Sequence, residues 1–334
     1  MSEELLVTAR SNPLIDPSLH IWTWEVAMYL FMGGLTAGIM ILAAFTTLRN
    51  KDQVAPFAAN RLALLAPIAL SIGMTTLFLD LEHKLFVYRF YTSFQITSPM
   101  SWGAWILIVV YPISVLQILS TVRTGYPSLA SFVDRLAIGR LITDWCERNR
   151  KEIAYAVIPF AVALGIYTGI LLSAFGARPF WNSGVLGLLF LVSGLSTAAA
   201  LVVLIARKKS EKALFTGLDL MLIFAEIALV ALSLISLASG SGQHIEALQL
   251  VMGGPYTLEF WVLFVGIGLL IPALLEILEM SGINKSLAML APVLVLIGGY
   301  ALRQVVLDAG QESTWTDYST QFNSELLQRL PGSD

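Results

Sequence analysis

Charge, cysteine and histidine are all scarce in this sequence, and each shortage excludes a class of protein or site. Only 13% of the 334 residues are charged, about half the share that a soluble globular domain carries, so a soluble protein is excluded. The single cysteine, Cys146, excludes internal disulfides, a cysteine-ligated zinc site and an iron–sulfur cluster held by this chain alone. The net charge of −3 provides no basic excess for nucleic acid. If the protein transfers electrons, another subunit must hold the metal.

Long apolar runs dominate instead. Hydrophobic residues make up 57% of the chain, and its mean hydropathy is +0.76. A bilayer core is crossed by about 20 apolar residues of helix, and eight stretches meet this length, so we predict an all-α integral membrane bundle of eight transmembrane helices. The first stretch is too long for a removable signal, and Glu3, Glu4 and Asp16 precede it. The expected spans are Trp22–Leu48, Arg61–Leu79, Trp102–Ile118, Ile153–Phe175, Gly184–Ile205, Leu214–Leu237, Leu258–Leu278 and Leu287–Val306.

Lys and Arg are unevenly distributed over the connections between these spans. Most of them follow the first, third and fifth spans, and the positive-inside rule assigns such connections to the cytoplasmic side. Both termini are therefore expected on the outer, periplasmic side of a bacterial inner membrane. This orientation divides the chain into an outer N-terminal segment, residues 1–19, a membrane domain, residues 20–306, and an outer C-terminal tail, residues 307–334.

A short sequence repeat suggests that the spans form two sets of four. MGGLTAG, Met32 to Gly38 in the first span, resembles VSGLSTA, Val192 to Ala198 in the fifth span, and tryptophans precede both copies. Because the copies lie in the first and fifth spans, four spans apart in the chain, both would run from outside to inside, as in a parallel repeat. The alternative is that small residues recur wherever membrane helices pack closely.

Two of the connections are long enough to carry structure of their own. Residues 82–100, expected outside, are rich in Phe and Tyr, which suits a membrane interface or a docking surface. The middle of residues 121–152, expected inside, has the pattern of an amphipathic helix, and we expect it to lie on the inner leaflet. Its apolar and basic side chains are Phe132, Leu136 and Leu141, and Arg135, Arg140 and Arg148.

Ionisable side chains inside the spans are functional candidates, because burying them is costly unless they are paired. Asp219 and Glu226 are seven residues apart and share a helix face. They could pass protons from the inner surface to the midplane, or they could be packing groups hydrogen-bonded to neighbouring helices. Glu276 and Glu279 are expected at the inner interface. The remaining ionisable residues are expected toward the outer side and comprise His20, Glu25, Asp80, Glu82, His83, Arg178 and Arg303.

The positions of the three histidines distinguish between cofactors. All three fall at or beyond outer span ends, whereas an integral b-type haem needs two axial histidines inside a helical core, so haem is not expected. His20 stands beside Trp22, Trp24 and Glu25, which form a hydrogen-bonding ring of groups at the outer leaflet. The near-neutral pKa of an ordinary histidine suits proton exchange with a quinol hydroxyl.

Three strings in this sequence resemble one family, the polysulfide reductase membrane subunit PsrC and the nitrite-reductase-associated NrfD proteins. HIWTWEVAMYLFMGGLTAG, His20 to Gly38, is similar to the first span of that family. The segment from Leu79 to Trp105 resembles its second-to-third connection, with TSPMSWGAW, Thr97 to Trp105, as the most specific part. The segment from Tyr167 to Leu201 resembles its fourth and fifth spans. Together these strings indicate the family, and they do not indicate the substrate.

The resemblance implies that a quinone, either menaquinone or ubiquinone, binds at the outer side of the first four helices. It also implies that this chain holds no haem, iron–sulfur cluster or other metal. In this family a histidine before the first span and a tyrosine from the bundle contact the quinone head group, and the matching residues here are His20 and Tyr167. Asp80, Glu82 and His83 would release protons to the outer water. The other expected cofactor contacts are Trp22, Trp24, Glu25 and Arg178.

The family resemblance also implies a buried route of arginine and carboxylates toward the inside, for which Arg178, Asp219 and Glu226 are the candidates. The chain departs from the family pattern after Leu79-Asp80-Leu81, where it continues Glu82-His83-Lys84 instead of Arg or Gly followed by Arg-Pro. The outer rim therefore carries more titratable side chains here than the family pattern has at these positions. This departure leaves the contacts of the rim residues open.

The implied partner is a ferredoxin-like protein with four iron–sulfur clusters on the outer face. Beyond it would stand a molybdopterin oxidoreductase or a multihaem cytochrome. The expected function is thus that of a respiratory quinone oxidoreductase subunit that acts only within a complex in the lipid bilayer. The terminal substrate, the direction of electron flow, proton translocation and a dimer of complexes stay open at this point.

Two other functions also stay open, a secondary ion or anion transporter and a purely structural membrane anchor. Transporters usually contain spans interrupted at the midplane by Gly and Pro. Here Pro272 stands alone in the second half of the seventh span, which disfavours the transporter. Bound quinone would separate a quinone subunit from an anchor.

Overall fold

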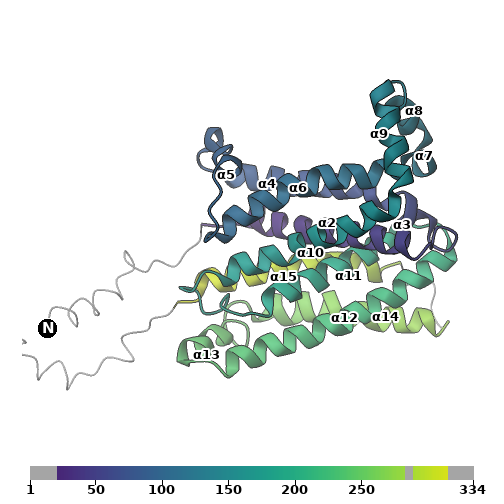
Figure 1. Ribbon diagram of the computed structural model, residues 1–334. Coiled ribbons are helices and arrows are strands. Elements are labelled where there is room, and N and C mark those ends of the chain that lie inside the picture. The colour runs from purple at the N-terminus through teal and green to yellow at the C-terminus, as the bar shows by residue number, and fades with distance from the viewer. Residues whose placement is uncertain (1–20, 283–288, 315–334) are drawn as a thin grey trace, which may run out of the picture.

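The computed structural model describes residues 21–282 and 289–314, and within them the chain is a bundle of long helices (Figure 1). Eight of the described helices are long and apolar enough to cross a membrane, so the chain is a multi-pass membrane protein. His20 lies outside the described residues. The spans are α2 (Trp24–Leu48), η1 with α4 (Leu62–Asp80), α6 (Pro99–Leu119), α10 (Arg150–Ser173), α11 (Leu186–Ile205), α12 (Lys209–Ala238), η3 with α14 (Glu259–Met280) and α15 (Ala291–Glu312).

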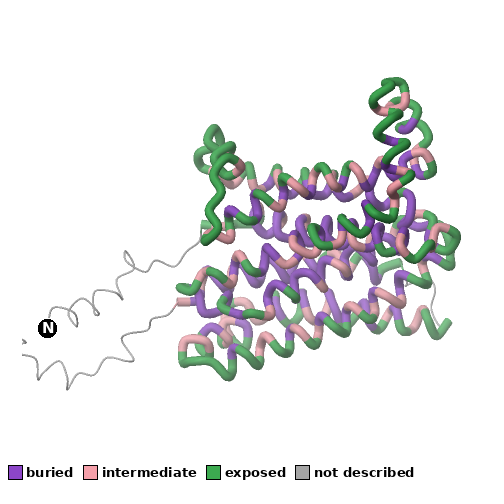
Figure 2. The backbone as a smooth tube through the Cα atoms, in the orientation of Figure 1, coloured by how far each residue is buried: buried purple, intermediate pink, exposed green. Residues whose placement is uncertain are grey.

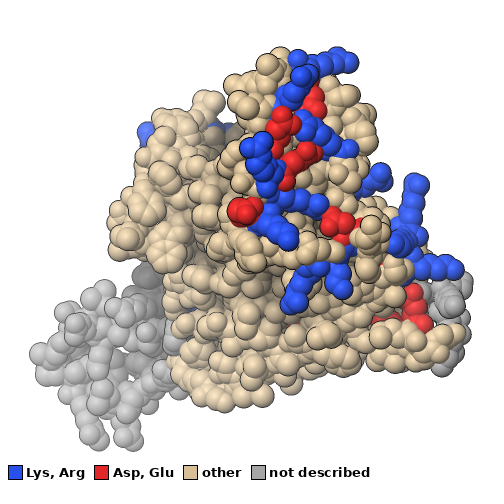
Figure 3. Space-filling view, turned by 45° about the vertical axis from the view of Figure 1, so that its right-hand side comes forward, with Lys and Arg blue, Asp and Glu red and all other residues tan. Residues whose placement is uncertain are grey.

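Shorter helices fill the connections. We call the end of the bundle at which α2 begins the outer end and the opposite end the inner end, after the orientation predicted from the sequence. Lys and Arg side chains gather at the inner end (Figure 3). The short helices are α3 (Pro56–Asn60), η1 (Leu62–Leu64), η2 (Lys84–Phe86), α5 (Arg89–Thr92), α7 (Val122–Gly125), α8 (Pro127–Val133), α9 (Ala137–Arg148) and α13 (Gly242–Gln249).

The eight expected spans are confirmed, and the largest difference in their bounds is at the last one. The tail was expected to begin at residue 307, but α15 continues to Glu312, and Leu307 and Ala309 are fully buried. The extension is held by Trp181, whose Nε1 donates a hydrogen bond to the Val306 carbonyl at 2.7 Å. The indole lies directly on Gly310, where a Cβ would come within 1.7 Å of Nε1. Tertiary packing therefore prolongs a helix whose sequence has already turned polar.

The helices form two sets of four with the same internal packing. In the first set α2 packs on α4 and α10, and α6 packs on α10; in the second set α11 packs on α12 and α15, and η3 packs on α15. The most buried helices lie between the sets (Figure 2). Both repeat segments are found there, because α2 packs on α11.

Glycines make the central contact between α2 and α11 possible. A Cβ on Gly38 would lie 2.2 Å from the Gly194 carbonyl oxygen, and one on Gly194 would lie 2.4 Å from the Gly34 carbonyl oxygen. Such a close backbone approach is typical of small-residue interfaces in membranes. The repeat and the small-residue explanation are thus both correct, because the repeated motif is the packing motif that joins the two sets.

A buried carboxylate ties the two sets together at the inner end. Glu211, in the first turn of α12, is 1% exposed. Its oxygens accept hydrogen bonds from the backbone N–H groups of Phe57 at 3.2 Å and Ala58 at 2.7 Å. These N–H groups begin α3 and have no partner within that helix, and an anion is favourable at a helix N-terminus. The second set thereby holds the first inner connection in place.

Candidate functional site

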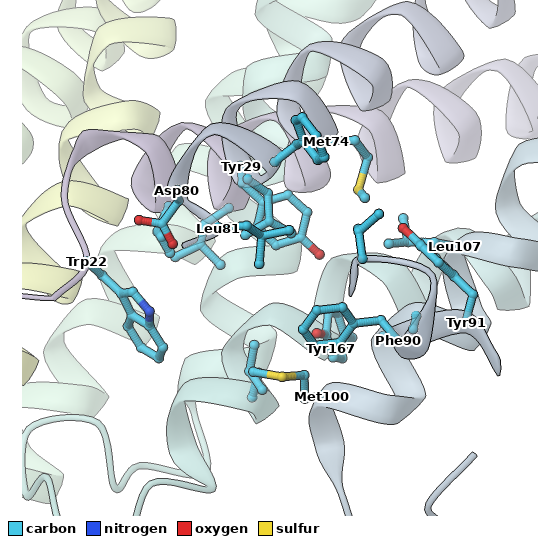
Figure 4. Close-up of a pocket in the computed structure, with 18 of the residues that line it drawn as sticks. Trp22, Tyr29, Met74, Asp80, Leu81, Phe90, Tyr91, Met100, Leu107 and Tyr167 are labelled. Carbon is cyan, nitrogen blue, oxygen red and sulfur yellow. The ribbon is translucent and has the colours of Figure 1, made fainter. Parts of the chain in front are cut away.

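A cavity of about 350 Å³ opens at the outer end of the first four-helix set, between α2, α4, α6, α10 and the connection that follows α4. Its wall is apolar except for two tyrosine hydroxyls from the helices, one tyrosine from the connection, one carboxyl group and one indole (Figure 4). The lining residues are Trp22, Val26, Tyr29, Leu30, Met74, Leu77, Phe78, Asp80, Leu81, Val87, Phe90, Tyr91, Met100, Gly103, Ala104, Leu107, Tyr167, Leu171 and Leu172.

Two tyrosines supply the polar groups in the middle of the cavity. Tyr29 of α2 and Tyr167 of α10 are 4% and 6% exposed, and their hydroxyl groups lie close enough to interact. Figure 4 places both rings between Trp22 on one side and Tyr91 on the other. Two neighbouring hydroxyls in an apolar slot can donate to and accept from a ligand oxygen, because each hydroxyl has one proton and two lone pairs.

The position of the Tyr167 ring depends on a glycine in the facing helix. A Cβ on Gly103 of α6 would lie 2.0 Å from Cζ and 2.1 Å from the hydroxyl oxygen of Tyr167. The phenol therefore occupies the space that any larger residue at position 103 would fill. A side chain there would push the hydroxyl out of its place in the cavity.

The outer edge of the cavity is built by groups from three elements. Asp80 is the last residue of α4 and is half-buried, and it lies close enough to Glu25 for their charges to interact. Trp22 stacks on Trp181 with ring centroids 5.6 Å apart. Its backbone is held by Gln311, which accepts from the Trp22 N–H at 2.9 Å and donates to its carbonyl at 2.8 Å. The end of α15 thus fixes the start of α2 at the cavity.

A second, more open cavity of about 550 Å³ adjoins the first. The two share Leu81, Phe90 and Met100 in their walls. The second cavity is also lined by Glu82 and His83, so titratable groups border the way from the first cavity to the surface.

Not every residue selected from the sequence reaches the cavity. Trp22, Asp80 and Tyr167 line it, and Glu82 and His83 line its neighbour. The expected contacts of Trp24 and Glu25 are absent from the lining described by the structure, because Trp24 is 50% exposed and Glu25 instead accepts a hydrogen bond from Thr23.

Arg178 also serves a different purpose from the expected one. It is 4% exposed and donates hydrogen bonds to the backbone carbonyls of Gln311 at 3.0 Å and Ser313 at 2.9 Å. It therefore stabilises the end of α15 and borders neither the cavity nor Glu226. The extension of α15 explains these contacts, because it brings the Gln311 and Ser313 carbonyl groups beside Arg178.

Tyr29, Tyr91 and Gly103 line the cavity but were not predicted from the sequence. Tyr29 follows Glu25 by four residues and so lies on the same helix face, and this spacing could have indicated it. Tyr91 comes from a connection that is far from α2 in sequence, and burial followed by the proximity of Tyr111 raises the pKa of its hydroxyl. No local pattern could show that Gly103 faces a ring.

A second group of polar residues is buried in the second four-helix set, centred on Arg303 of α15. Arg303 has no exposed surface. Its guanidinium donates to the Ser193 hydroxyl at 2.5 Å and to the Gly299 and Phe190 carbonyls at 2.8 and 3.0 Å. Its charge interacts with that of Glu226, which is 2% exposed. Placing Arg303 at the outer face was wrong, because α15 continues well past residue 306 and leaves this arginine in mid-helix.

Asp219 and Glu276 continue this group toward the inner end. Asp219 is fully buried and accepts a hydrogen bond from Ser196 at 2.6 Å. Glu276 was expected at the inner interface; it is 1% exposed and so is covered by neighbouring helices, whereas Glu279 is half-buried. The carboxyl groups of Asp219 and Glu276 lie close enough to interact, and neither Glu276 oxygen has a hydrogen-bond partner among the described residues. Two buried carboxyl groups this close cannot readily both be charged, so one of the two keeps a proton. Glu276 faces inward because α14 packs on α12 and α15.

The fold and this site define a multi-pass helical membrane protein with a polar-edged apolar cavity at one end of its first four helices. The family model described as "Polysulphide reductase, NrfD" matches residues 9–313. The chain belongs to the NrfD family. It is 29% identical to a polysulfide reductase polypeptide of Wolinella succinogenes, over 87% of this chain and 94% of the relative. It is 30% identical to protein NrfD of Escherichia coli K12, over 87% and 95%, and 24% identical to a selenate reductase polypeptide of Mesobacillus selenatarsenatis, over 93% and 79%.

Proposed function

We propose that this chain is the quinone-binding membrane subunit of a respiratory oxidoreductase complex and that the outer cavity is its quinone site. The observation that carries the proposal is the pair of neighbouring tyrosines, Tyr29 and Tyr167, inside an apolar cavity at one end of the bundle. Ligand sites are commonly apolar cavities with a few convergent polar groups. The names of the relatives, which include polysulfide and selenate reductase subunits, support membership of such a complex.

The lining residues suit a quinone ring. Apolar side chains such as Leu107 and Met74 can contact the ring faces and the isoprenoid tail, while the Tyr167 hydroxyl bonds to one ring oxygen. His20, two residues before Trp22 in the chain, is proposed to bond to the other. A bound quinol supplies two electrons and releases two protons on oxidation. The Tyr29 and Tyr167 hydroxyls would relay one of these protons toward the rim, because a hydroxyl can donate its own proton as it accepts another.

Proton release and electron transfer would both occur at the outer end. Asp80, at the rim of the first cavity, and Glu82 and His83, in the second, would pass protons to the outer water. The chain holds too few cysteines for a cluster, so electrons would go to an iron–sulfur partner. The exposed apolar side chains of the connection after α4 offer a docking surface beside the cavity. They are Leu85, Phe86, Tyr88, Phe94 and Ile96.

Filling the cavity tests this proposal directly. Ala104 lines the cavity and is 7% exposed, so Ala104→Phe should occupy the ligand space and weaken binding of a fluorescent hydroxyquinoline N-oxide inhibitor on the order of tenfold or more. Ile108→Phe is the matched control, because residue 108 lies one turn further along α6, is 39% exposed and does not line the cavity. Unchanged binding by a correctly assembled Ala104→Phe complex would place the inhibitor outside this cavity and overturn the site, and a parent complex that binds no inhibitor would leave the chain an anchor.

We further propose that the buried acids of the second set take up protons from the inner side. The supporting observation is their continuity, from the proton-sharing pair Asp219–Glu276 to Glu226 beside Arg303. Such ionisable groups in a membrane interior commonly mark proton routes. Protons that are taken up from the inside and passed toward the outer end during turnover would carry charge across the membrane and make the reaction electrogenic.

Substituting Glu226 separates proton uptake from electron transfer. In proteoliposomes, Glu226→Gln should abolish the membrane potential generated by turnover, while turnover continues when the membrane is made permeable to protons. Glu279→Gln should leave both unchanged, because Glu279 is half-buried outside this group. A normal potential from Glu226→Gln would reduce the buried acids to packing groups.

A further inference from the structure

Two short helices extend sideways from the inner end of the bundle. In Figure 1, α8 and α9 stand apart from the spans, and α9 runs across the direction of α6 and α10. Only Asn149 separates the end of α9 from the start of α10. Because the spans follow the membrane normal, α9 lies along the membrane surface. With a rise of about 1.5 Å per residue, its 12 residues form an arm that overhangs the bilayer beside the bundle.

The exposed surface of this arm carries a continuous apolar stripe. Ile138, Leu141, Ile142 and Trp145 follow one another at helical spacing and are 68%, 70%, 41% and 52% exposed. The face that packs on the rest of the molecule is formed instead by Gly139, Thr143 and Cys146, of which the last two are fully buried. Gly139 lies against Val133 of α8, and α9 also packs on α6 and α10. The stripe is therefore surplus to the packing of the arm. It is extended beyond α9 by Phe132 and Leu136.

The arm has a fixed shape and a positive exposed surface. Arg123 of α7 forms ion pairs with Asp134 at 2.9 Å, Asp144 at 2.6 Å and Glu147 at 2.9 Å. Its guanidinium lowers the pKa of the Asp134 carboxyl. One arginine thus pairs with three acids of the arm and joins α7 to the end of α8 and to the second half of α9. The exposed cations that remain on the arm are Arg135, Arg140 and Arg148. Figure 3 shows Lys and Arg side chains gathered at this end of the molecule.

We propose that the α8–α9 arm binds the inner membrane leaflet through anionic phospholipids, with the stripe among the acyl chains and the three arginines on the head groups. An exposed apolar stripe bordered by arginines is the pattern of interfacial helices. The arm also begins and ends at the inner ends of two spans, at head-group depth. Cations near an anionic surface increase binding about fivefold each. The bilayer is thus a partner of complementary chemistry at the right place.

The depth of the stripe is the first test. In a Cys146→Ala background, the only cysteine is removed, so Leu141→Cys and Arg140→Cys can each carry one environment-sensitive fluorophore in the purified full chain. In vesicles with a quencher on the acyl chains, the label at 141 should be strongly quenched and the label at 140, which lies about 100° around α9 and away from the stripe, should not. Equal, weak quenching at both positions would overturn the proposal. So would a label at 141 shielded only in dimers or by a partner protein, which would make the stripe a protein interface.

Lipid charge is the second test. Adding phosphatidylglycerol to phosphatidylcholine vesicles should raise the thermal stability of the parent chain. When the lipid is brominated, it should also increase the quenching of tryptophan fluorescence. The Arg135→Gln, Arg140→Gln, Arg148→Gln triple variant should lose most of the rise in stability. Trp145→Phe should lose the part of the quenching that Trp145 contributes, which is a test that needs no engineered cysteine. A triple variant that responds to phosphatidylglycerol as the parent does would overturn the role of the arginines.

Discussion

Tyr167→Phe should lower quinol-linked turnover of the complex on the order of 100-fold, the contribution typical of a positioned proton-transfer group. The substitution removes one oxygen and keeps the ring, which Gly103 accommodates from the facing helix. The apolar contacts of the cavity are therefore retained. We expect kcat to fall and KM to change little, because the lost hydroxyl acts on the reacting oxygen more than on ligand retention.

Two comparison variants make this expectation specific. Tyr155→Phe removes a hydroxyl from the same helix at a residue that is 67% exposed, and it should leave turnover unchanged. Tyr29→Phe removes the hydroxyl that lies beside that of Tyr167, so turnover should fall less and the pH profile should shift. Normal turnover by Tyr167→Phe with an intact partner subunit would remove this residue from the proposed quinone site.

The second large effect is expected on stability. Arg303→Met removes three hydrogen bonds from a fully buried guanidinium and leaves the nearby Glu226 without its counter-charge. Losing these hydrogen bonds and leaving a buried carboxyl group without a nearby positive charge costs about 3 kcal/mol or more, so the melting temperature should fall clearly, as measured by thermal unfolding in detergent.

A double variant separates the charge from the packing. Arg303→Met combined with Glu226→Leu replaces both charges by apolar groups, which is often nearly neutral for stability. It should recover most of the melting temperature while remaining unable to translocate protons. If the double variant is as unstable as Arg303→Met, the hydrogen bonds to Ser193 and Phe190 carry the stability and the pairing with Glu226 does not.

Local patterns predicted the spans well because each span satisfies its own backbone and differs from water-exposed segments in composition alone. The same patterns correctly identified Trp22, Asp80 and Tyr167 as neighbours, since family motifs contain all three. The patterns failed for two arginines. Arg178 was expected near Glu226 but binds the end of α15, whereas Arg303 was expected at the outer side but lies near Glu226. Hydropathy could not show that α15 continues past residue 306, because Trp181 and Arg178 supply its partners from another part of the chain.

By itself, the sequence determined the membrane class, the eight spans, the motif that joins the two sets and the amphipathic character of α9. These are periodic or compositional properties, and they need no knowledge of which helices touch. The tertiary structure decided that Gly103 makes room for Tyr167, that Tyr29 lies beside it in the cavity, and that Glu276 meets Asp219 in the interior. Each of these is a contact between residues on different helices, and its existence depends on helix rotation and depth, which packing sets.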